Sequence, residues 1–246
     1  MGMESFVAAS DLHGDRQDKA ATAIFKKFVG QFKPKFRVFL GDIFDFRAIR
    51  VGADREEKMH SMKQDFAAGM EFLEWFRPHV ILLGNHDQRL YDIVEKDGLR
   101  KTGPLVDYAE DLIAEFESAT KKLGTTVLPY DKRRGVFQRS GLKFVHGSDG
   151  MDPDNMANVY GDVLYGHGHA IDRSSPPTSE NVRTARMVGC LCQLDMTYNR
   201  AQTKTLRQQH GWAYGVFLGP RKHAVDQATI TDGQLVYADR FNVITA

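Results

Sequence analysis

Cysteine is nearly absent from this chain of 246 residues, which has only Cys190 and Cys192, separated by one residue. Two cysteines so close in sequence exclude a framework of structural disulfides. No run of eight consecutive apolar residues occurs, so a membrane span or a signal-peptide core is not expected. We therefore expect a cytoplasmic protein that has no membrane partner.

An excess of either charge is also missing, because 33 basic residues nearly balance 32 acidic ones and leave a formal net charge of +1. A balance of this kind gives no global attraction to nucleic acids or membranes, so any affinity for anions must be local. The contents of 42% hydrophobic and 26% charged residues are ordinary for a globular protein. The length is sufficient for one large α/β domain, and we expect a single domain over residues 1–246.

Five short polar motifs each follow a β-prone run, at residues 5–9, 36–40, 80–83, 142–145 and 163–165. We expect their side chains at the carboxyl ends of strands, where open α/β sheets place their sites. Alternation along an extended strand further predicts that the two polar residues of the first motif project the same way, and likewise the two histidines of the last. The motifs are Asp11-Leu12-His13, Gly41-Asp42-Ile43-Phe44-Asp45, Gly84-Asn85-His86-Asp87, His146-Gly147 and Gly166-His167-Gly168-His169.

The side chains of these motifs are imidazoles, carboxylates and one amide, with no thiolate. Imidazole suits Zn and Fe, whereas carboxylate and carbonyl oxygen suit Mn, Mg and Ca. The mixed set favours Mn, Fe or Zn, and it is atypical of a closed structural zinc site, which uses four ligands and commonly cysteine. Five of the nine histidines fall inside the motifs; His60, His79, His210 and His223 are interpreted as structural or surface residues.

In this order, the motifs resemble those of the calcineurin-like metallophosphoesterase superfamily, and the resemblance covers residues 11–169. It implies a four-layer α/β/β/α sandwich and two divalent metal ions, with a slight preference for Mn. It also implies that His86 protonates the leaving oxygen and that Asp45 orients His86. The implied ligands are Asp11, His13 and His169 for one ion, Asn85, His146 and His167 for the other, and Asp42 as a bridge between them.

The implied reaction is hydrolysis of phosphodiesters or small phosphate esters by attack of a metal-bridging hydroxide, with His86 as general acid. Protein serine/threonine phosphatases of the superfamily typically read G-D-x-V-D-R-G and R-G-N-H-E. Here Phe46 follows Asp45 and Leu83 precedes Gly84, so two phosphate-clamping arginines are missing from their usual places. The nearby Arg47, Arg50 and Arg89 are either substitutes for them or solvent-facing loop residues.

This departure favours the wider phosphoesterase group, including phosphodiesterases and nucleases. Phosphomonoesterase or protein phosphatase activity is the alternative within the same class. A catalytically silent binding protein on the same fold is the alternative of another class, because a fold does not determine a function. The substrate is thus expected to be a phosphate ester, with nucleotides and nucleic acids among the candidates, and the oligomeric state stays open.

Hydrophobic periodicity predicts helices over residues 17–32 and 55–76 and a third around residues 108–123, followed mostly by strands. The stretch 172–210 is a candidate substrate-facing insertion, because Ser174-Ser175-Pro176-Pro177 predicts an exposed loop. An ordinary solvated loop followed by a helix over residues 198–209 is the alternative. The stretch is rich in basic residues, namely Arg173, Arg183, Arg186, Arg200, Lys204 and Arg207.

Overall fold

A computed structural model describes residues 3–96, 98–148, 150, 152–176, 183–194 and 207–238. Its larger sheet has the strand order β14-β13-β12-β1-β2-β3-β6. The pairs from β1 through β2 and β3 to β6 are parallel, and the remaining pairs are antiparallel. The strands are β1 Glu4–Ala9, β2 Phe36–Phe39, β3 Val80–Leu82, β6 Thr126–Leu128, β12 Gly211–Gly219, β13 Lys222–Thr231 and β14 Gln234–Leu235.

The second sheet has the order β10-β11-β9-β8-β7, with parallel pairing of β11 with β9 and of β9 with β8. The two outer pairs, β10 with β11 and β7 with β8, are antiparallel. The strands are β7 Phe137–Arg139, β8 Leu142–Val145, β9 Val163–Tyr165, β10 Ile171–Ser174 and β11 Ala185–Val188. All five β-prone runs identified in the sequence are therefore strands, and each ends just before its motif.

Five α-helices and three 3₁₀ turns are present in the described part of the chain. The first helix, expected from residue 17, begins at Lys19, because the Asp18 side chain accepts a hydrogen bond from Ala21 N and caps it. The elements are α1 Lys19–Phe32, α2 Met62–Phe76, α3 Asn85–Val94, α4 Pro104–Leu123 and α5 Pro153–Tyr160, with η1 Gly14–Arg16, η2 Arg47–Ile49 and η3 Glu57–Met59.

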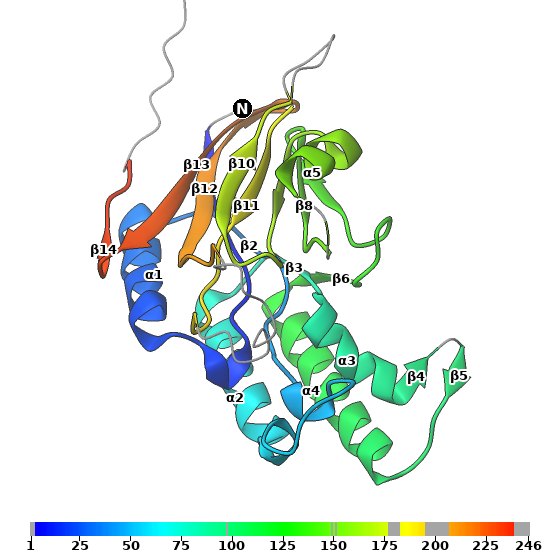
Figure 1. Ribbon diagram of the computed structural model, residues 1–246. Coiled ribbons are helices and arrows are strands. Elements are labelled where there is room, and N and C mark those ends of the chain that lie inside the picture. The colour runs from blue at the N-terminus through cyan, green and yellow to red at the C-terminus, as the bar shows by residue number, and fades with distance from the viewer. Residues whose placement is uncertain are drawn as a thin grey trace, which may run out of the picture.

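Three separate apolar clusters mark the interfaces of a four-layer α/β/β/α sandwich, as the resemblance implied. Two adjacent residues of β1 face different interfaces: Val7 packs toward the helices, and Phe6 packs between the two sheets. A third cluster packs Met156 and Ala157 of α5 against the second sheet. Helices α1 and α5 accordingly lie on opposite sides of the two sheets (Figure 1).

The second predicted helix begins later than expected, and helix α5 was not predicted. The helix expected from residue 55 begins at Met62, where the Ser61 side chain accepts from Gln64 N and caps it. The preceding residues form η3 because Asp54 and Glu57 each accept a hydrogen bond from the other's backbone N–H. Helix α5 was not expected after residue 125, although Asp152 caps it and Pro153 occupies its first position.

The stretch 172–210 is not an insertion along its whole length. Residues 171–174 and 185–188 are β10 and β11, so the predicted exposed loop cannot begin before residue 175. Strand pairing of Ile171 with Val188 places this part within the second sheet. Residues 177–182 and 195–206 lie outside the described residues, and with them most of the alternative helix 198–209.

A short antiparallel hairpin of β4 Glu95–Lys96 and β5 Leu99–Arg100 projects beyond α3 and α4 (Figure 1). None of the helices in the described ranges is long and apolar enough to cross a membrane.

Candidate metal centre

The five motifs meet where the carboxyl ends of strands from both sheets face one another. Strands β1, β2 and β3 of the larger sheet and β8 and β9 of the second sheet each end immediately before one motif. This is the location expected from the sequence for a site in an open α/β sheet. Residues separated by more than 150 positions are thereby brought into contact, as the 3.2 Å between the Nε2 atoms of His13 and His169 shows.

An unusual backbone conformation orients most of the candidate ligands. Five of them have φ between 53° and 65°, in the left-handed region that side chains other than glycine rarely adopt. Such conformations cluster at functional sites because the surrounding structure must stabilise them. The alternation of side chains expected along an extended strand does not apply to these residues, because they follow the strands rather than continue them. The five are Asp11, His13, Asp42, His167 and His169.

Asp11, His13 and His169 form the first cluster, and all three are at least 95% buried. Nε2 of His169 lies 3.3 Å from Oδ1 of Asp11 and 3.2 Å from Nε2 of His13. Oδ1 of Asp11 is buried and has no hydrogen-bond partner among the described residues. A buried carboxylate oxygen facing two imidazole nitrogens is the arrangement expected around a cation.

The second cluster consists of Asn85, His146 and His167. Oδ1 of Asn85 lies 3.1 Å from Nε2 of His146 and 2.9 Å from Nδ1 of His167. His146 donates through Nδ1 to Leu40 O at 2.7 Å, which leaves Nε2 free to face the cluster. His167 and His169 therefore belong to different clusters, and the expectation that both project the same way was wrong.

Asp42 lies between the two clusters. Its Oδ2 is 3.3 Å from Nε2 of His146 and 3.9 Å from Nε2 of His13, while Oδ1 accepts from His86 N at 2.8 Å. One carboxylate oxygen thus faces a histidine of each cluster, as the bridging assignment requires. Burial opposes the charge of Asp42, but His146, His86 and His13 hold its pKa well below its usual range.

The surroundings of His13 and His146 raise the pKa of both imidazoles. Burial disfavours the charged imidazole, yet the hydrogen bond to Asp45 raises the pKa of His13 to about 9, and Asp42 raises the pKa of His146 to about 9. A cation bound to these imidazoles would therefore have to displace their protons. The imidazole, carboxylate and amide donors, together with the unpartnered Asp11 oxygen, fit two divalent ions.

His86 and Asp45 lie beside the clusters as an acid–base pair. Nδ1 of His86 is 2.8 Å from Oδ1 of Asp45, and the same oxygen is 3.4 Å from Nδ1 of His13. The pKa of Asp45 lies well below its usual range because hydrogen bonds from His13 and His86 outweigh the effect of burial. Burial lowers the pKa of His86, so its protonated form is a comparatively strong acid.

The three nearby arginines differ in their surroundings. Arg47 is buried and contacts both oxygens of Asp15, at 2.7 and 2.9 Å, and Arg50 pairs with Glu57. Arg89 instead places one guanidinium nitrogen 3.1 Å from Nε2 of His86, and the other donates to Asp45 O at 2.7 Å. Of the three, Arg89 alone contacts the His86 ring, and because a guanidinium can only donate, Nε2 of His86 accepts this hydrogen bond.

Two supporting carboxylates were missed by the sequence analysis. Asp87 accepts hydrogen bonds from the backbone N–H groups of Gly84, Asp42 and Phe44 and so fastens two motifs together. Burial and the charge of Asp42 raise the pKa of Asp87 to about 7. Asp65 accepts in the same way from the backbone of Asp45 and Phe46. Asp87 belongs to a recognised motif, whereas nothing in the local sequence marks Asp65.

Close approach of the backbone explains two of the motif glycines. A Cβ added to Gly84 would lie 2.1 Å from Oδ1 of Asp42, and one added to Gly166 would lie 1.8 Å from Oγ of Ser10. A cleft of about 300 Å³ adjoins His146, and Tyr130, Lys132 and Tyr160 are among the residues that line it. The second cluster, whose Asn85 and His167 are only partly buried, is thus accessible from this side.

Comparison with known proteins identifies the family. A family model described as calcineurin-like phosphoesterase matches residues 5–187, so the chain belongs to this family of metal-dependent phosphoesterases. This confirms the resemblance inferred from the motifs. A search of the curated proteins finds no match.

Solved structures support the fold. Vacuolar Protein Sorting 29 from Cryptosporidium parvum aligns with a TM-score of 0.52 and 13% identity, covering 96% of both chains. Vps29 from Chaetomium thermophilum has a TM-score of 0.50 and 12% identity and covers 96% of this chain and 93% of its own. A metallophosphoesterase from Sphaerobacter thermophilus has a TM-score of 0.49 and 13% identity, covering 92% and 88%. At these identities the similarity shows the fold alone.

Proposed function

We propose that the protein is a dinuclear metal-dependent hydrolase of phosphate esters, with phosphodiesters as the preferred substrates. The observation that carries the proposal is the position of Asp42 between two histidine-containing clusters, with His86 and Asp45 alongside. This arrangement supplies the ligands for two ions and a proton donor from one compact set of side chains.

The roles of the residues follow from their contacts. When bound, two divalent ions supply positive charge for the phosphoryl oxygens and lower the pKa of a water nucleophile. Asp42 compensates the charge of both ions. Because Nδ1 of His86 is held by Asp45, the proton for the leaving oxygen would come from Nε2, the nitrogen that Arg89 contacts in this structure. Burial lowers the pKa of His86, and the hydrogen bond to Asp45 opposes this effect by favouring the protonated imidazole that the step needs.

Arg89 is the arginine that we assign to the substrate phosphoryl group. Its guanidinium lies against Nε2 of His86, on the side where the leaving oxygen would be protonated. Arg47 and Arg50 pair closely with Asp15 and Glu57, whereas the carboxylate oxygen that Arg89 faces, Oδ1 of Asp45, is 3.6 Å away. If Arg89 is the one of these three arginines that meets the substrate, its single charge suits a phosphodiester better than the doubly charged phosphomonoester, and this supports the preferred substrate class.

The alternative of a catalytically silent binding protein keeps some support. Two of the structural neighbours are named as vacuolar sorting proteins rather than as enzymes. The acid–base pair of His86 and Asp45 and the complete set of candidate ligands favour catalysis in this chain. A test of turnover must therefore separate the loss of proton transfer from the loss of metal ions.

His86→Ala provides this test. The variant is expected to retain its metal ions and to hydrolyse alkyl phosphodiesters about 10²–10⁴-fold more slowly. Nitrophenyl esters should lose less activity, because a good leaving group needs little protonation. His79→Ala is the control, since His79 precedes the amino end of β3, opposite the site. Equal losses for both leaving groups would contradict the assignment of His86 as general acid.

A further inference from the structure

The segment that follows β11 is bonded to the loop that carries Asp11 and His13. Leu191 N donates to Asp11 O at 3.0 Å, and Asp18 N donates to Leu191 O at 2.8 Å. Gln193 N donates to Arg16 O at 2.8 Å, and Cys192 forms a β-bridge with Gln17. These bonds fix the position of Cys192 beneath the first cluster, where its side chain is 4% exposed.

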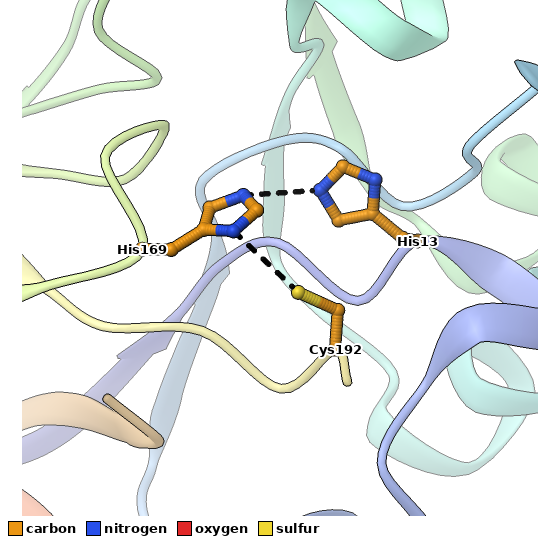
Figure 2. Close-up of side chains that lie close together, drawn as sticks. All are labelled: His13, His169 and Cys192. Atoms are coloured by element: carbon orange, nitrogen blue, oxygen red, sulfur yellow. Dashed lines mark hydrogen bonds between the residues drawn. The ribbon is translucent and has the colours of Figure 1, made fainter. Parts of the chain in front are cut away.

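Cys192 contacts one of the candidate metal ligands. Its Sγ lies 3.6 Å from Nδ1 of His169, while Nε2 of the same ring faces His13 (Figure 2). Asp11 also lies on the Nε2 side, at 3.3 Å. The thiol and the cluster therefore occupy opposite edges of the His169 ring.

This arrangement matters because an imidazole that binds a cation through Nε2 carries a proton on Nδ1. That N–H needs an acceptor in a buried site, and in metal sites the acceptor is usually a carboxylate, a backbone carbonyl or water. A thiol sulfur is a weaker acceptor, and its larger radius is consistent with the 3.6 Å separation. Among the described residues, Cys192 Sγ is the hydrogen-bond partner of His169 Nδ1.

We propose that Cys192 is a positioning residue of the metal centre, whose sulfur accepts the Nδ1 proton of His169 and so directs Nε2 toward the first ion. The proposal gives a function to a residue outside all five motifs.

Direct ligation by Cys192 is the competing reading, since ligand atoms of His13, His169 and Cys192 lie within 4.8 Å of one another. One His169 nitrogen cannot face both the sulfur and the Asp11 carboxylate, however. The buried Oδ1 of Asp11, which has no hydrogen-bond partner in the described part of the chain, places the cation on the Nε2 side. The sulfur then accepts the proton of His169 Nδ1 and does not bind the cation.

The test measures metal affinity, so it rests on the metal centre of the proposed function but not on hydrolysis. Cobalt(II) or manganese(II) is titrated into the chelator-treated protein against a competing chelator, with thermal unfolding as a check on the fold. Cys192→Ala is expected to weaken the binding of one ion by about 10–100-fold, as loss of such a hydrogen-bond partner typically does. Cys192→Ser, which retains a hydroxyl acceptor, should lie between Cys192→Ala and the wild type.

Cys190→Ala is the control for packing, because Cys190 is also buried but its thiol donates to the backbone carbonyl oxygens of Cys192 and Gln209 and not to a candidate ligand. It should leave metal affinity unchanged. Equal losses in Cys190→Ala and Cys192→Ala would attribute the effect to packing and overturn the proposal, as would unchanged affinity in Cys192→Ala. Thiolate-to-cobalt charge-transfer absorption that disappears in Cys192→Ala would overturn it in favour of direct ligation. Failure of the wild-type protein to bind any ion would overturn the proposed function as well.

Discussion

Asp87→Ala tests whether the two motifs that carry Asp42 and His86 depend on one buried carboxylate. Asp87 is 2% exposed and accepts three backbone N–H groups, at 2.9, 2.9 and 3.0 Å. Leaving a buried donor unsatisfied costs about 1–3 kcal/mol. Three donors would sum to roughly 3–9 kcal/mol; entry of water, and removal of a charge that burial and Asp42 disfavour, bring the expected loss to the lower end, about 3 kcal/mol.

A loss of this size is a large fraction of the roughly 5–15 kcal/mol that stabilises a typical domain. The assay is urea denaturation followed by circular dichroism at about pH 8, above the pKa of Asp87. Asp87→Asn should lose less than Asp87→Ala, because an amide oxygen can keep the bonds to Gly84 and Asp42 while its NH₂ group opposes the N–H of Phe44.

Asp92→Ala serves as the control, since Asp92 lies on the same helix but is partly exposed, and its carboxylate accepts from the Gln88 side chain rather than from buried backbone N–H groups. We expect it to change stability by about 0.5 kcal/mol or less. If Asp87→Ala unfolds within about 1 kcal/mol of the wild type and binds metal normally, the reasoning from buried donors is refuted.

Three further predictions concern the metal centre and the substrate. Asp42→Ala should lose both ions and activity together, because two cations without their shared carboxylate repel each other; retention of both ions by elemental analysis would contradict the bridge. Cations bind neutral imidazole, and the pKa values of His13 and His146 are raised to about 9. Metal affinity measured by chelator competition should therefore rise with pH up to about 9 and fall toward acid. A flat pH profile would contradict this competition between metal ions and protons. Paired substitution Arg183→Ala and Arg186→Ala should weaken use of a long nucleic-acid substrate and spare a small nitrophenyl ester if the stretch 172–210 contacts substrate, and equal effects on both would indicate a structural role.

Much of the fold and site was predictable because each motif is local and follows its own strand. The side chains of Asp42 and His146 come from different sheets, yet their strands end at the same edge, so their proximity could be expected from the sequence. The orientation of the ligands could not be predicted as well, because it depends on left-handed backbone conformations, whereas the alternation rule assumes extended strands.

Other features depend on contacts that local sequence does not reveal. The boundary of α2 was set by the mutual contacts of Asp54 and Glu57, where helical periodicity alone favoured an earlier start. The contact of Cys192 with His169 spans 23 positions and arises from the pairing of two loops. Helix α5, in contrast, had readable signals in Asp152 and Pro153, so its omission was an error of interpretation.

The most direct test of the central claim is to count bound ions and measure turnover in one preparation. The purified chain is stripped with a chelator, reloaded with Mn²⁺, Fe²⁺ or Zn²⁺, and assayed with bis-p-nitrophenyl phosphate and p-nitrophenyl phosphate. The account predicts two ions per chain, given two clusters joined by Asp42, and metal-restored hydrolysis that is faster for the diester. Two bound ions without hydrolysis of either ester would contradict the enzyme and support the binding protein, and fewer than two ions would contradict the metal centre itself.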